Sequence, residues 1–178
     1  VVYRLDTSGQ KPFVVRSGLA GTTNGGSYRL VSRTGPGSPP AEWQDRCWNP
    51  ASEMEFFADE DGGRTALGIR NVKGTPAAML FTPQFDCPSG TCRLRFEYQT
   101  AARDKQFYVK FKPDGNQPAW SVADLPGTGD GWRAEDLVVD LKGATRGFFE
   151  FHNSAPPPVP ARLRGLTVSE VGGGPAAA

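Results

Sequence analysis

The sequence predicts an all-β protein, built as a jelly-roll β-sandwich of two antiparallel sheets. Apolar and polar residues alternate with a period of two in several runs, and turn sequences separate those runs. In addition, 22 Gly and 16 Pro interrupt most windows long enough for an amphipathic helix. About a dozen short strands at this spacing are typical of a sandwich or jelly roll. No repeat of fixed length is present, which argues against a propeller or solenoid.

The individual strands follow from the same alternation. Apolar residues occupy every second position of 93–99, 107–112 and 136–141, which predicts three half-buried strands. The first of these carries Leu94, Phe96 and Tyr98 on its apolar face. Further candidates, in chain order, are 1–6, 13–16, 28–33, 54–58, 66–72, 78–85, 148–152 and 163–171.

The length of 178 residues suits one domain. We expect residues 1–171 to form the sandwich and residues 172–178, rich in Gly and Ala, to form a flexible tail or linker. The chain starts at Val1 and enters an apolar run at once, as an excised domain of a larger protein would.

Charge and motifs exclude several classes of function. The net charge of +1, from 20 basic and 19 acidic residues, offers no overall field for nucleic acid. No run approaches the roughly 18–20 apolar residues that span a bilayer. Phosphate loops, nucleophile elbows and metalloprotease motifs are absent from the sequence, so we expect no enzyme. A small hydrolase using Glu97 and Glu150 is the weaker alternative, because glycosidases need two facing carboxyl groups.

Three cysteines leave two interpretations open. Cys87 and Cys92 bracket a turn-rich loop, so a disulfide could close the end of a hairpin. Such a bridge would place the protein outside the reducing cytoplasm. The alternative is two buried free thiols. Zinc is not expected, because Cys47 and His152 belong to no paired ligand motif.

From Cys92 onward the sequence resembles a known family. The predicted strands, the Gly131-Trp132 step and the closing run at 163–171 are similar to the C-terminal half of galactose-binding-like jelly rolls that serve as carbohydrate-binding modules. Residues 65–71 and 148–153 also look like accessory domains of large bacterial proteins of the planctomycete type.

The resemblance implies a non-catalytic module that recognises a polysaccharide or oligosaccharide. Its location would be extracellular, at the cell surface or periplasmic, and it would be a monomer tethered to a larger chain. The alternative is a protein-interaction or structural accessory domain that binds no sugar. No cofactor is required, although the resemblance would look for a structural calcium ion at Asp6 and Glu170.

Two sets of residues are candidates for binding sugar. If strands 93–99, 107–112 and 148–152 share a sheet, their outward positions form a polar groove, and its excess of Lys and Arg favours an anionic or hydroxyl-rich glycan. The groove candidates are Arg95, Glu97, Gln99, Tyr108, Lys110, Glu150 and His152. The alternative is a solvated outer face with cross-strand ion pairs.

Tryptophans in loops form the second set. Trp43, Trp48 and Trp120 lie in turn-rich stretches, where aromatic side chains can form a binding platform at one end of a sandwich. Alternatively, these rings plug the end of the core, a role that the resemblance implies for Trp132.

Overall fold

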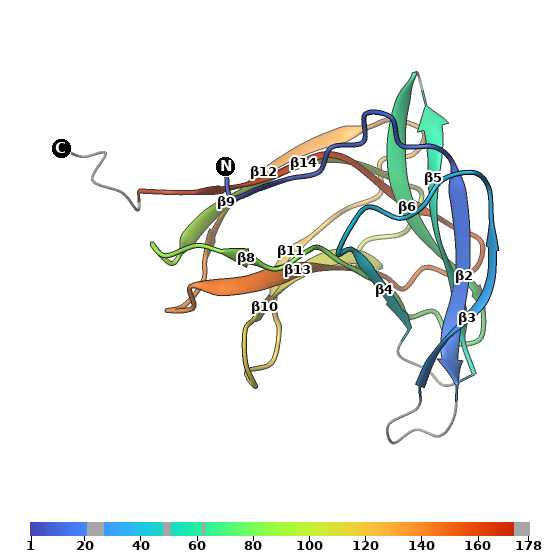
Figure 1. Cartoon of the computed structure of the whole chain (residues 1–178), viewed down its shortest axis with the longest axis horizontal. Coiled ribbons are helices and arrows are strands. Elements are labelled where there is room, and N and C mark those ends of the chain that lie inside the picture. The colour runs from blue at the N-terminus through green and yellow to red at the C-terminus, as the bar shows by residue number, and fades with distance from the viewer. Residues whose placement is uncertain (21–26, 48–50, 62, 173–178) are drawn as a thin grey trace.

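The computed structural model describes residues 1–20, 27–47, 51–61 and 63–172. Two antiparallel sheets pack face to face, which confirms the predicted all-β jelly-roll sandwich. Figure 1 shows β9, β12 and β14 as one layer above β8, β10, β11 and β13, while β2, β3, β5 and β6 curve around one end.

The larger sheet has the order β12-β9-β14-β6-β5-β2-β3, and β1 pairs with β14. Its strands are β1 (Tyr3–Arg4), β2 (Phe13–Ala20), β3 (Ser27–Thr34), β5 (Glu53–Asp61), β6 (Arg64–Lys73), β9 (Thr91–Thr100), β12 (Arg133–Asp140) and β14 (Ala161–Glu170).

The smaller sheet has the order β11-β10-β13-β7-β4, and β8 pairs with β13. Its strands are β4 (Gln44–Cys47), β7 (Ala78–Phe81), β8 (Phe85–Asp86), β10 (Phe107–Pro113), β11 (Trp120–Asp124) and β13 (Arg146–Asn153). The sequence did not predict β4 or β11, because the Gln-Asp-Arg-Cys run of β4 has no apolar alternation and β11 is short. The predicted strand 78–85 divides into β7 and β8.

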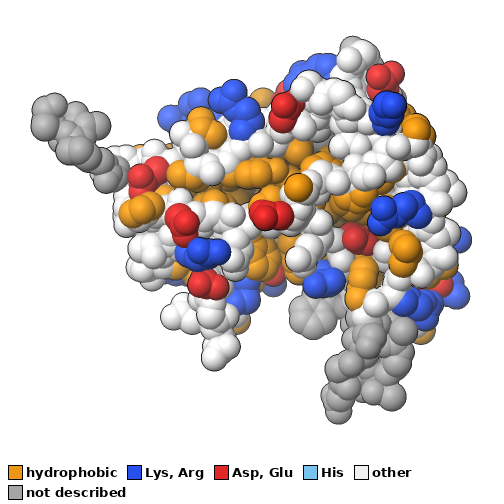
Figure 2. All heavy atoms as spheres, in the orientation of Figure 1, with side chains coloured by type: hydrophobic (Ala, Val, Ile, Leu, Met, Phe, Trp, Pro, Cys, Tyr) orange, Lys and Arg blue, Asp and Glu red, His pale blue; other side chains and the backbone are white. Residues whose placement is uncertain are grey.

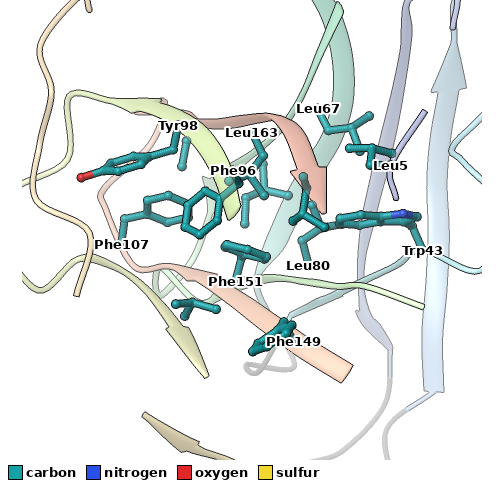
Figure 3. Packing of buried hydrophobic residues seen from close by; sticks show 14 of the residues in the cluster. Leu5, Trp43, Leu67, Leu80, Phe96, Tyr98, Phe107, Phe149, Phe151 and Leu163 are labelled. Atoms are coloured by element: carbon teal, nitrogen blue, oxygen red, sulfur yellow. The ribbon is translucent and has the colours of Figure 1, made fainter. Parts of the chain in front are cut away.

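Aromatic side chains fill the space between the sheets. Phe96 of β9 meets Phe151 of β13 edge to face with 5.3 Å between ring centroids, and Tyr98 packs beside Phe107 at 5.8 Å (Figure 3). Each such pair adds roughly 0.5–1.5 kcal/mol beyond the buried area. Figure 2 shows hydrophobic side chains in a band between the layers, flanked by charged groups. The predicted inward face of β9 is therefore confirmed.

Two buried asparagines join the sheets at one end of the core. On β6, Asn71 donates its amide hydrogens to the carbonyls of Asn153 (2.8 Å) and Ala155 (2.9 Å). Its Oδ1 accepts from the amides of Ala77 and Ala78, just before and at the start of β7. In return, Asn153 Nδ2 donates to the carbonyl of Ile69 on β6 at 3.0 Å. These bonds fix β13 and β7 of the smaller sheet against β6 of the larger one.

Cys87 and Cys92 form no disulfide, so the bridge, one of the two interpretations that the sequence left open, is wrong. Cys87 and Cys92 are both buried thiols, so the alternative interpretation holds. The Cys87 thiol is directed to the carbonyl of Thr91, with 3.2 Å between Sγ and O. Burial, with a smaller effect of nearby Cys87, raises the pKa of the Cys92 thiol to about 12. Cys92 is therefore a protonated, unreactive core side chain at neutral pH.

Both sheets share one core, and their strands extend from Tyr3 to Glu170. Gly172 is exposed, and the remainder of the predicted C-terminal tail lies outside the described residues.

Replacement of Asn153 by Ala should lower the free energy of unfolding by about 2–4 kcal/mol, because buried backbone groups lose their partners. Urea denaturation measures this change. The matched control is Asn116→Ala, at an exposed position, which should change the free energy by less than about 0.5 kcal/mol. Similar values for the two variants would show that the asparagine pair does not hold the sheets together.

Alkylation in denaturant without reductant should label all 3 cysteines of the chain, because no thiol is used in a bridge. Cys87 and Cys92 should resist the same reagent in the folded protein at neutral pH, since both are buried. Mass spectrometry counts the labels. Only one label after denaturation would establish the disulfide and contradict the structure.

Candidate ligand-binding groove

A groove runs over the outer face of the smaller sheet. Alternation sends Phe149 and Phe151 of β13 into the core, so Phe148, Glu150 and His152 lie on the opposite face. The outward residues of neighbouring strands lie beside them in register: Lys112, Lys110 and Tyr108 on β10, and Phe81 and Met79 on β7. The floor of the groove is therefore built from β13, β10 and β7.

The groove consists of two adjoining hollows of about 620 and 380 Å³, which share Phe81 and Phe148. Pro118 and Ala119, just before β11, line one side of the larger hollow, and Arg46 of β4 also lines it. Figure 1 shows the connection between β10 and β11 projecting beyond the smaller sheet. The smaller hollow is lined by Glu42, Gln44, Phe81, Thr82, Gln84, Arg146 and Phe148.

Aromatic rings are partly exposed along the groove. Phe81 and Phe148 are tilted by 43° with 5.2 Å between ring centroids, and neither is fully buried. The Tyr108 ring stacks on that of His152, with 4.9 Å between centroids and 14° between planes. The groove thus offers apolar ring surface to a ligand.

Polar groups lie on the groove floor. The Nε2 atom of His152 lies 3.0 Å from Oε1 of Glu150, and both side chains are almost fully buried. Burial raises the pKa of Tyr108, and the charges of Glu150 and Asp124 add to this effect. The Tyr108 hydroxyl therefore stays protonated near neutral pH and can donate a hydrogen bond to a ligand.

A contact from the larger sheet holds the β4 side of the groove. The Tyr28 hydroxyl of β3 donates to Oδ2 of Asp45 at 2.6 Å, and burial followed by the charge of Asp45 raises the Tyr28 pKa. The Arg46 guanidinium lies 5.2 Å from the centroid of the Tyr28 ring and donates to Gln44 Oε1. These contacts position Arg46 along the groove.

Only part of the predicted groove is assembled. Tyr108, Lys110, Glu150 and His152 share the outer face of the smaller sheet. Arg95, Glu97 and Gln99 do not, because β9 pairs with β12 and β14 in the larger sheet. The condition on which the full groove depended, that all three strands share a sheet, is not met. For the same reason Glu97 and Glu150 lie on opposite outer faces of the sandwich and cannot act as the paired carboxylates of a hydrolase.

The outer face of the larger sheet carries a network of ion pairs instead. Each arginine of this network has a nitrogen within 2.6–3.9 Å of a carboxylate oxygen. The pairs are Arg16 with Glu53 and Glu55, Arg29 with Glu53, Arg64 and Arg164 with Glu97, Arg70 with Glu55, Arg93 and Arg95 with Asp136, and Arg162 with Asp59. The guanidinium groups of Arg70 and Arg162 also cover the ring of Phe57. The alternative prediction, a solvated face with cross-strand ion pairs, describes this side of the molecule.

The predicted tryptophan platform is not formed by the described residues. Trp43 is a core residue whose indole Nε1 donates to the Tyr3 hydroxyl at 2.6 Å. Trp120 packs on the core residue Phe111 with 5.2 Å between centroids, beneath the Lys142 ammonium. Trp48 lies outside the described residues. The Trp132 ring packs against Arg164, whose Cζ lies 3.8 Å from its centroid.

The sequence analysis missed most of the groove lining, including Arg46, Met79, Phe81 and Phe148. One signal was available, because a period of two places Phe148 on the same face as Glu150 and His152. Arg46 carried no such signal, since β4 was not predicted.

The two candidate calcium ligands do not form one site. Leu5, next to Asp6, hydrogen-bonds to Leu166, whereas Glu170 is in register with Cys92 near the other end of β14. Asp6 accepts from the Ser8 amide and Glu170 from the Ser89 amide. Across the described part of the chain, no three His, Cys, Asp or Glu side chains form a group that could hold a metal ion.

The sequence matches no protein-family model and no curated protein. Solved structures do resemble the fold. A mutant of a carbohydrate-binding module of family 29 has a TM-score of 0.52 and 16% identity, over 74% of this chain and 82% of that one. The K1 cleaved adhesin domain of Lys-gingipain from Porphyromonas gingivalis W83 has a TM-score of 0.54 and 14% identity, over 75% and 94%.

A third structure, described as CBM4, has a TM-score of 0.51 and 10% identity, over 71% of this chain and 85% of its own. The expected resemblance to carbohydrate-binding modules is thus confirmed at the level of the fold. A separate finding concerns membranes: within the described ranges, no helix is long and apolar enough to span one.

Proposed function

We propose that this chain is a non-catalytic carbohydrate-binding module that holds a polysaccharide or oligosaccharide in the groove of the smaller sheet. One observation carries the proposal: partly exposed aromatic rings lie beside cationic, amide and hydroxyl side chains in a continuous hollow. Sugars present an apolar C–H face and many hydroxyl groups, and this surface offers partners for both. Two of the structures similar in fold are themselves carbohydrate-binding modules.

Different residues of the groove would provide the apolar contacts and the hydrogen bonds to a sugar. Phe81 and Phe148, which are shared by the two hollows, provide the apolar surface on which a sugar ring rests. Gln44 lies opposite Phe81 on β4 and supplies hydrogen bonds to hydroxyl groups. Tyr108 lies farther along the same face, opposite His152, and can donate to a sugar that extends past the hollow. Because the groove extends past the phenylalanine pair in both directions, it suits a chain of sugars better than a single one.

The proposal extends to the setting of the module. We place it outside the cytoplasm, as a monomeric unit tethered to a larger chain, where extended polysaccharides are available. A disulfide would have argued for export, but Cys87 and Cys92 do not form one. The proposed location therefore depends only on the proposed polysaccharide ligand. A protein-interaction domain is the second candidate, because one structure with the same fold is the adhesin domain of Lys-gingipain.

A glycan array followed by isothermal titration calorimetry tests the proposal. Phe148→Ala should weaken binding of the selected glycan about 5- to 150-fold, because an exposed ring surface worth about 1–3 kcal/mol is lost. Val138→Ala is the matched control, since Val138 is 64% exposed on β12 of the larger sheet. This variant should bind the selected glycan with unchanged affinity.

Absence of binding to every glycan by the folded chain would contradict the proposal and favour the protein-interaction candidate. Binding that is lost in the Val138 variant but kept in the Phe148 variant would move the site to the larger sheet. Thermal unfolding of both variants establishes that they remain folded during these measurements.

A further inference from the structure

We propose that the ligand of the groove is an anionic glycan, whose acidic groups meet Lys110, Lys112 and Arg46. This inference rests on the proposed function and specifies its substrate class. The three cations line the larger hollow from two sides, Lys110 and Lys112 on β10 and Arg46 on β4. Two strands, β13 and β7, lie between them. At about 4.8 Å per strand, cations stand on both flanks of a ligand roughly 14 Å across.

Lys110 is the central group of this set. It lies opposite Glu150 in register, yet no carboxylate of the described residues comes within the 4.0 Å of an ion pair with its ammonium group. Its Nζ lies 6.0 Å from the centroid of the Tyr108 ring, at the edge of a cation–π contact. The charge of Lys110 is therefore available to a ligand that rests on the groove floor.

Lys112 and Arg46 are held by neutral groups. The ammonium of Lys112 donates to the backbone carbonyls of Pro113 (2.8 Å) and Gly115 (2.9 Å). The Arg46 guanidinium bonds to the amide oxygen of Gln44 at 2.9 Å and lies over the Tyr28 ring. Both positive charges are thus oriented by neutral partners and not compensated by carboxylates among the described residues.

The carboxylates near the groove do not neutralise the positive charges of Lys110, Lys112 and Arg46. Glu150 is engaged by His152 on the floor, and Glu42 lines the neighbouring hollow, beyond the phenylalanine pair. Arg146, which lines that second hollow, is compensated by Asp86 at 3.5 Å. The larger hollow consequently contains three cations and one carboxylate.

The other face of the molecule shows that this pattern is local. On the larger sheet, arginines such as Arg70, Arg93 and Arg162 each have a carboxylate within 3.1 Å or less. The net charge of the whole chain is only +1, so a general excess of basic residues does not explain the groove. Uncompensated cations in a concave surface attract anions and form charge-assisted hydrogen bonds with them.

Calorimetry with defined polymers tests the inference. We expect the chain to bind polygalacturonate at least about ten-fold more tightly than fully methyl-esterified polygalacturonate, because the ester removes the charge and keeps the sugar. Raising NaCl from about 50 to about 500 mM should weaken binding of the acid form only. Dextran sulfate and neutral dextran form a second pair, which distinguishes sulfate from carboxylate as the acidic group.

Variants locate the effect. Lys110→Met keeps the apolar stem and removes the charge, so it should weaken binding of the preferred acidic polymer roughly ten-fold, and Lys110→Arg should restore most of it. Arg95→Met, on the larger sheet, removes the same charge outside the groove and should leave affinity unchanged.

Three outcomes would overturn the inference, and only the third of them also overturns the proposed function. If the acidic and esterified polymers bind equally and Phe148→Ala weakens both, the groove binds neutral glycans and the charge has no role. If Arg95→Met weakens binding as much as Lys110→Met, the attraction is general. If no polymer or array glycan binds, the proposed function fails as well.

Discussion

The smaller sheet keeps its place because two buried asparagines tie it to the larger one. Asn71 and Asn153 have no contact with solvent that could replace their hydrogen bonds, so every donor and acceptor must be satisfied inside the protein. Their bonds reach β6, the start of β7 and the end of β13. Since β7 and β13 form the groove floor, the positions of Phe81, Glu150 and His152 depend on this polar cluster at the end of an aromatic core.

The two outer faces of the sandwich differ in whether their charged side chains are paired. On the larger sheet, arginine and carboxylate side chains pair across strands, and even the Phe57 ring is covered by guanidinium groups. Exposed pairs of this kind contribute roughly 0–1 kcal/mol each and fill the surface that a ligand would otherwise use. On the smaller sheet, rings remain partly exposed, and Arg46, Lys110 and Lys112 in the larger hollow lack carboxylate partners among the described residues. The outer face of the smaller sheet therefore keeps ring surface and positive charge that a ligand can contact.

The sequence predicted which face of a strand is buried more readily than which strands are neighbours. Alternation placed Leu94, Phe96 and Tyr98 in the core correctly, because a period of two is a local property of the backbone. Pairing is not local. Although β9 and β10 follow one another in the chain, they belong to different sheets, so Arg95 and Lys110 lie on opposite sides of the molecule. A groove predicted from adjacent strands was therefore only half correct.

The tryptophans and cysteines show a second limit of the sequence. A turn-rich setting did not reveal that Trp43 enters the core to meet Tyr3, forty residues earlier in the chain. Likewise, the spacing of Cys87 and Cys92 permits a bridge, but the orientation of the Cys87 thiol toward the Thr91 carbonyl decides against it. A tertiary contact determines the outcome for Trp43, and a local hydrogen bond accompanies it for Cys87.

The most direct test of the account is an amide chemical-shift map of the chain titrated with the glycan that binds best in the array. We expect a contiguous set of shifts on β7, β10 and β13, centred on Phe81, Lys110 and Phe148, while the amides of β9 and β14 stay unchanged. Shifts centred on Arg95 and Arg164, with none along β13, would place the site on the larger sheet and contradict the central claim.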